Sequence, residues 1–356
     1  MEVTSHATDK FVDAARNIKS FTQLPEWIYN QRISARPDPS SLPWLNDLLK
    51  VRMKSLSHID NPMYLALLEN KLSAEQLDHF MCEYYWGSGY GFQRLVLPEV
   101  QNKNGNAVWK DYIKGIILEE NTPEPHHGLF RNYMLKLGID AGQGKAAIPA
   151  AANEFNSNML AGYKASLGYA MGYALGIETE ADFQISLLYL ACLNRDPTET
   201  LHDPYFDIHM AEDGEEAHAR FTCECIEKML EAGEITRNEI EEGFIQAIVD
   251  TRDYMRTIHA SLPCASDDHR DEEKDNMKEK IYAIIATVAE TSPDKVHGTQ
   301  ELNADLGIDS LKLIDLVLGV EGEFSITLSE DALASITTVD ELEGHIESLL
   351  AEPQQS

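Results

Sequence analysis

The sequence predicts an all-α protein of two domains, and three observations lead to this prediction. Apolar residues recur at three- and four-residue spacing through most of residues 43–259, which is the period of an amphipathic helix. No alternation of apolar and polar residues lasts long enough to require a sheet. The chain of 356 residues also exceeds one ordinary core, and a charged stretch divides the long helical region from a short acidic segment.

The long region is expected to form a bundle of seven or more helices. Short polar breaks with Gly, Pro, Asn or Asp separate its helical segments. The segments with the clearest helical spacing are 63–100, 108–120, 128–139, 159–177, 183–193 and 220–233. Because no sheet accompanies them, these helices must bury their apolar faces against one another. The sequence therefore predicts one bundle domain over residues 1–260.

The charged stretch, residues 261–276, holds six acidic and two basic residues and no long apolar run. We expect it to be a flexible linker. The segment after it, residues 277–356, is expected to be a second domain. This segment contains 16 acidic and 4 basic residues, a net charge of −12, which leaves −19 of the total −31 for the chain before it. Both parts are acidic, and the small one is denser in charge.

Composition also excludes several classes of partner. A net charge of −31, from 60 acidic and 29 basic residues, repels nucleic acid and anionic membranes. No run of 18 apolar residues is present, so we expect no membrane span, and the first residues show no signal-peptide pattern. The cysteines are scattered without a C-x-x-C motif, which favours a reducing, cytoplasmic location and argues against structural zinc. They are Cys82, Cys192, Cys223, Cys225 and Cys264.

The small segment resembles an acyl carrier protein along its whole length. The resemblance is carried by DLGIDSL (305–311), LVLGVEGEF (316–324), ITTVDELEGHI (336–346) and KEKIYAIIATVAETSPDKV (278–296). It implies a small four-helix domain in which Ser310 carries a 4′-phosphopantetheine arm, attached by a phosphopantetheinyl transferase. The acidic helix after Ser310 would suit the basic patches of other pathway enzymes. Taken alone, Ser310 is also compatible with a plain helix N-cap.

Two places in the long region combine carboxylates with histidines. Glu119 and His126 are seven residues apart and would share a helix face, but prolines at 123 and 125 are expected to break the helix between them. In YFDIHMAEDGEEAHARF, residues 205–221, His209 and Asp213 are four apart and would share a face. His218 lies about 140° away from that face on a regular helix.

Glu178 is the third place, at the end of an otherwise apolar stretch where a carboxylate is costly unless it is paired or binds a cation. Each place has a plain alternative: solvated helix residues at Glu119 and Glu120, helix-starting histidines at 126 and 127, a solvated turn at 178–182, and an acidic surface at 205–221. Together, three carboxylates and three histidines on facing helices are the ligands expected of a di-iron or di-manganese site.

At these positions the chain resembles heme-oxygenase-like non-heme diiron oxygenases and oxidases, over roughly residues 45–255. The matching elements are E-x6-H-x-x-L-F, G-x5-E and Y-F-x-x-H-x3-D followed by H-A. The resemblance implies that this region folds as a heme-oxygenase-like bundle and binds two iron ions (Fe²⁺/Fe³⁺). It also implies that O₂ is a co-substrate. The ligands that it implies are Glu119, His126, Glu178, His209, Asp213 and His218.

The third element departs from the family pattern. The family has H-x3-D-x2-H, whereas this chain has H-x3-D-x4-H, which puts Glu216 at the usual position of the last histidine. One interpretation is a π-type bulge near Gly214 that turns His218 inward. The other is that Glu216 binds metal and His218 supports it. We favour His218. His202 and Glu154 are secondary candidates, and Cys223 and Cys225 are expected to pack in the bundle.

These observations predict an O₂-activating diiron oxygenase that acts on an acyl or aminoacyl group, held as a thioester on its own carrier domain, in specialised-metabolite biosynthesis. N-oxygenation, desaturation and oxidative C–C cleavage are all compatible reactions. The alternatives are a metal-independent enzyme on the same scaffold, of the thiaminase or quinone-forming oxidase kind, and a non-catalytic scaffold that docks the carrier. Homodimerisation is a further expectation, because relatives of the resembling family are often dimers.

Overall fold

The structure is a computed structural model, and it describes residues 11–351 except 17, 19, 102–104, 143, 145–146, 212–213, 264–266, 325, 327 and 329–335. The predicted all-α class is confirmed, because every named element is helical and the only β-type pairing among the described residues is an isolated bridge between Glu301 and Thr338. The chain divides into two compact units, Met1–Cys264 and Ala265–Ser356. Each unit has its own hydrophobic core.

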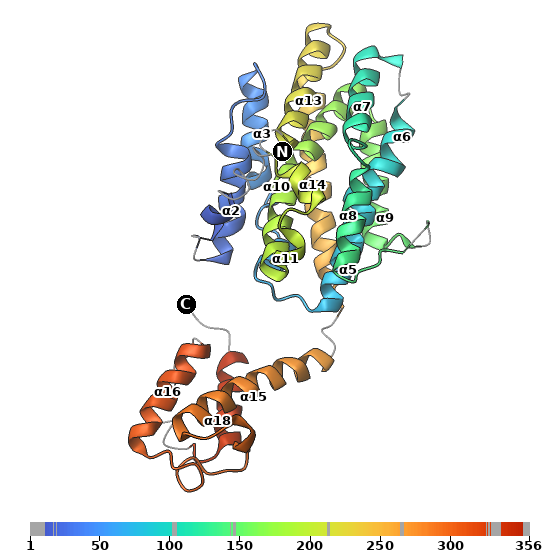
Figure 1. The fold of residues 1–356 in the computed structure, drawn as a ribbon. Coiled ribbons are helices and arrows are strands. Elements are labelled where there is room, and N and C mark those ends of the chain that lie inside the picture. Colours follow the sequence, from blue (N-terminus) through green and yellow to red (C-terminus); the bar gives the residue numbers. More distant parts are fainter. Residues whose placement is uncertain are drawn as a thin grey trace. The chain divides into compact units, whose positions relative to one another are not determined.

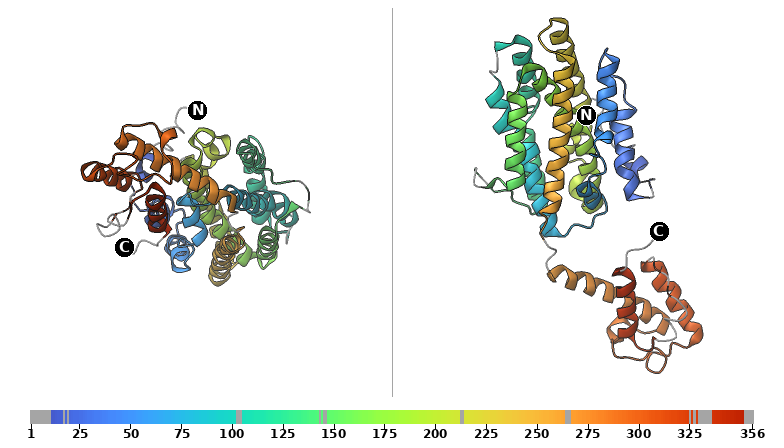
Figure 2. Two further views of the ribbon diagram at one scale, coloured as in Figure 1. Left: turned by 90° about the horizontal axis from the view of Figure 1, so that it is seen from below. Right: turned by 180° about the vertical axis from the view of Figure 1, so that it is seen from behind.

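The first unit is a helical bundle built around one long helix, α10. Figures 1 and 2 show α2 and α3 on one side of α10, and α7, α8 and α9 on the other. The elements are η1 (Phe21–Gln23), α2 (Leu24–Tyr29), η2 (Asn30–Ser34), α3 (Pro43–Ser55), α4 (Pro62–Leu68), α5 (Ala74–Tyr84), η3 (Tyr85–Gly89), η4 (Gly91–Val96), α6 (Leu97–Val100), α7 (Ala107–Glu119), α8 (His126–Lys136), α9 (Ala150–Lys164), α10 (Leu167–Arg195), α11 (Pro197–Thr200), α12 (Pro204–His209), α13 (Gly214–Glu231) and α14 (Arg237–Ala260).

Several helix starts follow directly from the sequence. Ser73 and Gln76 form a capping box at the start of α5, and Thr236 and Glu239 form another at the start of α14. In each box the hydroxyl and the longer side chain satisfy two backbone N–H groups that have no partner within the helix. Asn106 caps α7 by accepting from the backbone N–H of Trp109 at 3.0 Å. Local chemistry thus fixes where these helices begin.

α10 is buried on nearly all sides, which is why its sequence shows apolar and small residues without a single polar stripe. It packs most closely against α14, where glycines let the two backbones approach. A Cβ atom added at Gly172 would lie 2.0 Å from the carbonyl oxygen of Ile240, and one at Gly243 would lie 2.0 Å from that of Tyr169. The contact therefore requires glycine at both positions.

Substitution of Gly172 tests this contact. Gly172→Ala is expected to lower the free energy of unfolding by about 1–3 kcal/mol, because the added methyl must push two helix backbones apart. The matched control is Gly128→Ala in α8, where the nearest atom to an added Cβ is 4.0 Å away. The control is expected to change the free energy of unfolding by less than about 1 kcal/mol. Urea unfolding measures both, and equal effects would contradict the close-packing interpretation.

The cysteines of the first unit that the structure describes are reduced and mostly buried. Cys192, Cys223 and Cys225 are buried and Cys82 is partly exposed, which confirms the packing predicted for Cys223 and Cys225. Cys264 lies outside the described residues. Burial raises the pKa of Cys82 to about 11, with smaller contributions from nearby carboxylates. Burial likewise raises the pKa of Cys225 to about 11.

This shift predicts slow alkylation of Cys82 with a steep pH dependence. The thiolate is the reactive form, and a thiol with a pKa of about 11 is about one part in a thousand ionised at pH 8. Iodoacetamide should therefore modify Cys82 in the folded chain about tenfold faster for each pH unit between 8 and 10. Peptide mapping by mass spectrometry measures this rate. A pH-independent rate, or one equal to that of the urea-unfolded chain at pH 8, would rule the shift out.

The second unit contains α15 (Asp267–Ala289), η7 (Pro293–Lys295), α16 (Ser310–Phe324) and α18 (Val339–Ala351). Its core gathers apolar residues from these helices and the loops between them: Ile281, Ile285, Val296, Leu302, Ile308, Leu316, Val320, Val339, Leu342 and Ile346 among others. Three of the four predicted helices are thus present. Residues 325, 327 and 329–335, where the remaining helix would fall, lie outside the described residues.

The predicted linker is largely helical rather than coiled. The boundary between the two units lies at residue 264, inside the predicted stretch, but α15 begins at Asp267 and runs through the rest of it. Two aspartates open the helix, where the helix dipole favours negative charge, and the residues that follow include the good helix formers Glu, Lys and Arg. A high density of charge is common in flexible linkers, but this composition suits a solvent-exposed helix equally well.

No helix among the described residues has both the length and the apolarity that a bilayer crossing requires.

Candidate functional site

The first functional element is the junction between α7 and α8. α7 ends at Glu119 and α8 begins at His126, which confirms the break predicted from the two prolines between them. Glu120 caps the end of α7, and its backbone oxygen accepts from the backbone N–H of His126 at 3.0 Å. The two predicted ligands therefore come from different helices that meet at one turn.

His218 lies between two carboxylates. Its Nε2 is 3.0 Å from Oε2 of Glu119, and its Nδ1 is 3.2 Å from Oε2 of Glu178. His218 and Glu178 are buried, with 9% and 3% of their surface exposed, whereas the Glu119 side chain is half exposed. α7, α10 and α13 each supply one of the three. Two carboxylates on one imidazole make a negatively charged site that suits a cation.

His126 and His209 form a second group. Their ring centroids are 4.8 Å apart, and Nδ1 of His126 is 3.2 Å from Oε2 of Glu120. Nδ1 of His209 is 2.6 Å from the carbonyl oxygen of Tyr205. Because a carbonyl only accepts, Nδ1 of His209 carries a proton, and in the neutral imidazole the lone pair is then on Nε2. This is the arrangement in which a histidine binds a metal through Nε2.

A cavity joins the two groups. It encloses about 650 Å³ of empty space, part of it open to solvent, and both Glu178 and His209 line it. Glu120, Glu180 and His127 add further polar groups, and no lysine or arginine from the described part of the chain lines it. The remaining walls are largely aromatic and aliphatic: Tyr84, Phe92, Phe155, Met159, Ile177, Ile185 and Tyr205 among others. The composition of this cavity suits an organic group beside the six side chains that we call the His/Glu cluster: Glu119, Glu120, His126, Glu178, His209 and His218.

The segment 205–221 differs from the predicted single helix. α12 ends at His209 and α13 begins at Gly214, so the segment contains two named helices. The shared helix face of His209 and Asp213 stays a prediction. His218 faces the two carboxylates despite its spacing. Asp213 and the side chain of Glu216 lie outside the described residues.

The choice between His218 and Glu216 remains a prediction that two substitutions resolve. His218→Ala should lose at least one of two bound irons, because His218 contacts both Glu119 and Glu178. Glu216→Ala should keep both. Iron per chain, measured by plasma mass spectrometry after anaerobic loading, gives the result. The reverse pattern would assign the ligand role to Glu216.

The donor groups meet as imidazole–carboxylate contacts, of which His218 makes two, one through each ring nitrogen, and His126 makes one. Among the side chains that the structure describes, no group of three or more His, Cys, Asp and Glu is arranged to hold a metal ion. The donor chemistry nevertheless fits iron, because imidazole nitrogen and carboxylate oxygen are the donors of non-heme iron sites. The tautomer of His209 adds one donor that is already oriented.

Sequence reasoning missed the role of Glu120. Its carboxylate is buried, contacts His126 and accepts a hydrogen bond from Nε2 of Gln93 at 2.5 Å. Gln93 is held in turn by His127, whose backbone N and Nδ1 lie 3.1 and 2.6 Å from its Oε1. The pKa of His127 is lowered by burial and then by Arg94. In the sequence, the only indication of this network is that two glutamates and two histidines are adjacent, at 119–120 and 126–127.

The acidic residues that follow Glu178 on α10 do not form the solvated turn considered as an alternative. Glu180 and Asp182 are buried, with 4% of their surface exposed in each case. Asp182 accepts from Nε of Arg32 at 2.7 Å, and Glu180 lies 3.5 Å from Nε2 of His58. Burial, followed by the charge of Glu180, raises the pKa of Tyr64 next to them. α10 thus carries three buried carboxylates with three different partners.

Of the secondary candidates, neither lies in the cluster. Glu154 is exposed on α9, and His202 is largely exposed with its Nδ1 4.0 Å from Oδ1 of Asp207.

Ser310 is the first residue of α16. The cap of this helix is Asp309, whose Oδ1 accepts from the backbone N–H of Lys312 at 3.0 Å. Asp309 therefore supplies a capping hydrogen bond at this helix start, and the side chain of Ser310 lies outside the described residues. A turn through Gly307, at φ +61°, leads into this helix start. The serine of DLGIDSL thus stands at the point where the loop enters the helix.

Comparison with known proteins gives a consistent result for the second unit. Residues 279–346 match the family described as "Phosphopantetheine attachment site". The chain is 34% identical over 73 residues to acyl carrier protein 3 of Ralstonia nicotianae, covering 20% of this chain and 84% of the relative. It is 36% identical over 67 residues to an acyl carrier protein of Petrotoga mobilis, covering 19% and 79%. A relative from Cylindrotheca is 32% identical over 74 residues, covering 21% and 91%.

A structural comparison matches a CADD-like protein of unknown function from Nostoc punctiforme, with a TM-score of 0.37 and 15% identity, over 74% of this chain and 99% of that one. The sequence matches span most of each carrier protein. A phosphopantetheine arm, added by a phosphopantetheinyl transferase and loaded with an acyl thioester, is the cofactor that this domain implies. Through residues 279–346, the chain belongs to the acyl carrier protein family.

Proposed function

We propose that the first unit is a heme-oxygenase-like non-heme diiron oxygenase that acts on an acyl or aminoacyl group carried by Ser310. The ligands would be Glu119, His126, Glu178, His209, Asp213 and His218. When bound, the two irons would reduce and activate O₂. We propose likewise that Ser310 is the residue to which the phosphopantetheine arm is attached.

One observation carries the proposal. Side chains from α7, α8, α10, α12 and α13, far apart in the sequence, converge in the bundle, with contacts of 3.0–3.2 Å between imidazoles and carboxylates. Buried carboxylates are costly without a positive partner. A cluster of this composition beside a cavity is the arrangement that a metal-dependent active site requires.

The residues of the chain would divide the work. Tyr205 would orient His209 through its carbonyl oxygen, so that Nε2 is presented to metal. Gln93 would hold Glu120 against His126. The aromatic walls of the cavity would enclose the acyl group and limit water around it. A substrate attached to the carrier domain of the same chain would reach the site by an intramolecular step. Its effective concentration would then depend on the segment that joins the two domains and not on the concentration of free substrate.

Anaerobic addition of Fe(II) to the full chain, followed by exposure to O₂, tests the proposal. Two bound irons per chain and an O₂-dependent absorbance change are expected. A chain that turns over its substrate without iron would be a metal-independent enzyme on this scaffold. A chain that neither binds iron nor turns over any carrier-bound substrate would be a non-catalytic carrier-docking scaffold.

A further inference from the structure

Glu120 lies in the His/Glu cluster, although it is absent from the ligand set of the proposed function. Its side chain is 11% exposed, against 49% for that of its neighbour Glu119. Glu120 also lines the large cavity beside the cluster. Consecutive residues on a helix point about 100° apart, so the two glutamates at the end of α7 face different histidines. Glu119 contacts His218. Glu120 contacts His126.

The tautomer of His126 directs a lone pair at Glu120. Nε2 of His126 is 3.2 Å from the carbonyl oxygen of Thr122. Because a carbonyl only accepts, Nε2 carries a proton, and in the neutral imidazole the lone pair is then on Nδ1. Nδ1 lies 3.2 Å from Oε2 of Glu120. A lone pair and a carboxylate oxygen repel each other at this distance unless a cation, either a proton or a metal ion, lies between them.

The separation of these two atoms suits a shared metal ion. Carboxylate oxygen and imidazole nitrogen bind a divalent transition metal at about 2.1 Å. Two such donors are therefore about 3.0 Å apart at the right angle of an octahedral ion and about 3.4 Å apart at the tetrahedral angle. The 3.2 Å between Nδ1 of His126 and Oε2 of Glu120 falls between these values. The pair can therefore bind one ion with little movement of either side chain.

Glu120 is held in place by a residue from another helix. Nε2 of Gln93 donates to Oε2 of Glu120, and Oε1 of Gln93 accepts from the backbone N–H of His127 at 3.1 Å. The second bond fixes which end of the amide faces Glu120. Gln93 lies on η4, a π-helical segment, and such segments are frequent at functional sites. Carboxylates that bind metal ions are themselves hydrogen-bonded in this way.

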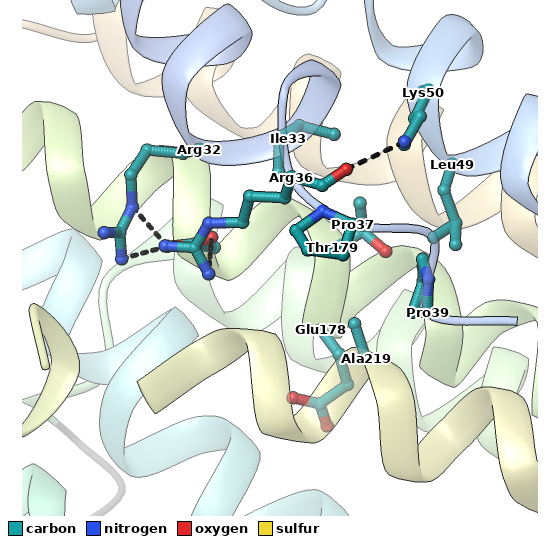
Figure 3. Close-up of a pocket in the computed structure, with 11 residues that line it drawn as sticks. Arg32, Ile33, Arg36, Pro37, Pro39, Leu49, Lys50, Glu178, Thr179 and Ala219 are labelled. Carbon is teal, nitrogen blue, oxygen red and sulfur yellow. Dashed lines mark hydrogen bonds and ion pairs between the residues drawn. The ribbon is translucent and has the colours of Figure 1, made fainter. Parts of the chain in front are cut away.

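Two arginines near the cluster contact a different carboxylate. Glu178 lines a second, smaller cavity between η2, α3, α10 and α13, and Arg32 and Arg36 line it too. Nη2 of Arg32 lies 2.5 Å from Oδ1 of Asp182, and Nη1 of Arg36 lies 3.4 Å from Oδ2 of the same carboxylate. Figure 3 shows the carboxylate of Glu178 lying apart from both arginines. The contacts of the two arginines are thus with Asp182.

With Glu120 as a ligand, the charges of the proposed metal site balance. Three of the proposed ligands, Glu119, Glu178 and Asp213, are carboxylates, and Glu120 makes four. Histidines bind metal ions as neutral imidazoles, so four negative charges meet the four positive charges of two Fe²⁺ ions. A buried carboxylate that is not neutralised is costly, which favours a cation beside Glu120 as well as beside Glu178.

We propose that Glu120 is a ligand to one of the two irons, which it shares with Nδ1 of His126, and that Gln93 orients it. This inference rests on the proposed function, because it adds a seventh residue to the metal site of that proposal. The two glutamates at the end of α7 then serve different ions. Glu120 binds the ion at His126, and Glu119 binds the ion at His218.

Iron binding by single variants tests the inference. Full chains of the parent, Glu120→Gln and Glu124→Gln are titrated anaerobically with Fe(II), and bound iron is measured by plasma mass spectrometry. Glu120→Gln should bind one iron instead of two, or bind the second more than about 100-fold more weakly, because loss of a residue that only supports a ligand costs about 10–100-fold. Glu124 is exposed in the same turn, and its variant should bind both irons as the parent does. Glu120→Ala replaces Glu120→Gln if circular dichroism shows that the latter is unfolded.

Two irons bound by a folded Glu120→Gln chain with the affinity of the parent would overturn the inference. So would a weakening of about 10–100-fold with both irons retained, which is the cost of a residue that only orients His126. Equal losses in Glu120→Gln and Glu124→Gln would also contradict it. In each of these cases the parent still binds two irons and the proposed function stands. A parent chain that binds no iron rejects the proposed function itself, so the parent distinguishes the two failures.

Discussion

Glu178→Gln is expected to weaken iron binding by more than about 100-fold and to abolish O₂-dependent turnover. Substitutions of residues that only support metal ligands cost about 10–100-fold in metal affinity, and removal of a carboxylate ligand should cost more. Glutamine keeps the shape of glutamate but loses the charge that a cation requires. Glu178 is 3% exposed, lies 3.2 Å from His218 and lines two cavities of the first unit, so its loss should affect the site more than any other single change.

Glu83→Gln is the matched control for this substitution. Glu83 is equally buried, on α5, but its carboxylate accepts hydrogen bonds from the backbone N–H groups of Ala151 and Ala152. Plasma mass spectrometry after anaerobic loading measures iron in both variants, and urea unfolding checks that each is folded. Full iron content in a folded Glu178→Gln chain, or equal losses in both variants, would remove Glu178 from the ligand set.

Ser310→Ala is expected to abolish attachment of phosphopantetheine completely. In the proposed function the Ser310 hydroxyl oxygen is the atom to which the transferase joins the arm, and alanine offers no replacement for it. After incubation with coenzyme A and a phosphopantetheinyl transferase, intact-protein mass spectrometry should show the added arm on the parent chain and none on the variant. The control, Ser292→Ala, removes a serine of the same unit that lies between α15 and η7 and should accept the arm normally.

The same variant separates a tethered substrate from a free one. Turnover of the physiological substrate should fall to background in Ser310→Ala, because no thioester forms and the effective concentration of the tethered group is lost. Iron content should stay at the level of the parent chain. A Ser310→Ala chain that turns over its substrate at the full rate would show that the oxygenase acts on free substrate.

Much of the architecture can be predicted from residues that are close together in the sequence. The helical periodicity of residues 43–259 predicted the bundle, and the two prolines near 123 predicted the end of α7 at Glu119. Helix 310–324 and the acyl carrier domain followed from DLGIDSL and its neighbours. These features depend on contacts between residues a few positions apart, and the spacing of side chains along the chain records such contacts.

The errors arose where local patterns permit two outcomes. Residues 267–276 are as compatible with an exposed helix as with a coil, because charged residues serve both. The segment around Gly214 was expected to stay one helix, yet α12 and α13 are separate. The spacing of apolar and polar residues does not distinguish one distorted helix from two helices.

By itself, the sequence determined the all-α class, the carrier domain and the types of side chain available for a metal site. Only the tertiary structure decided which of them meet: Glu119 and Glu178 at His218, Glu120 rather than solvent at His126, and Arg32 with Arg36 at Asp182. The physical reason is that most of these pairs join helices that are far apart in the sequence. Their distances depend on how whole helices pack, and helix packing is set by the sum of many buried contacts, not by any local pattern.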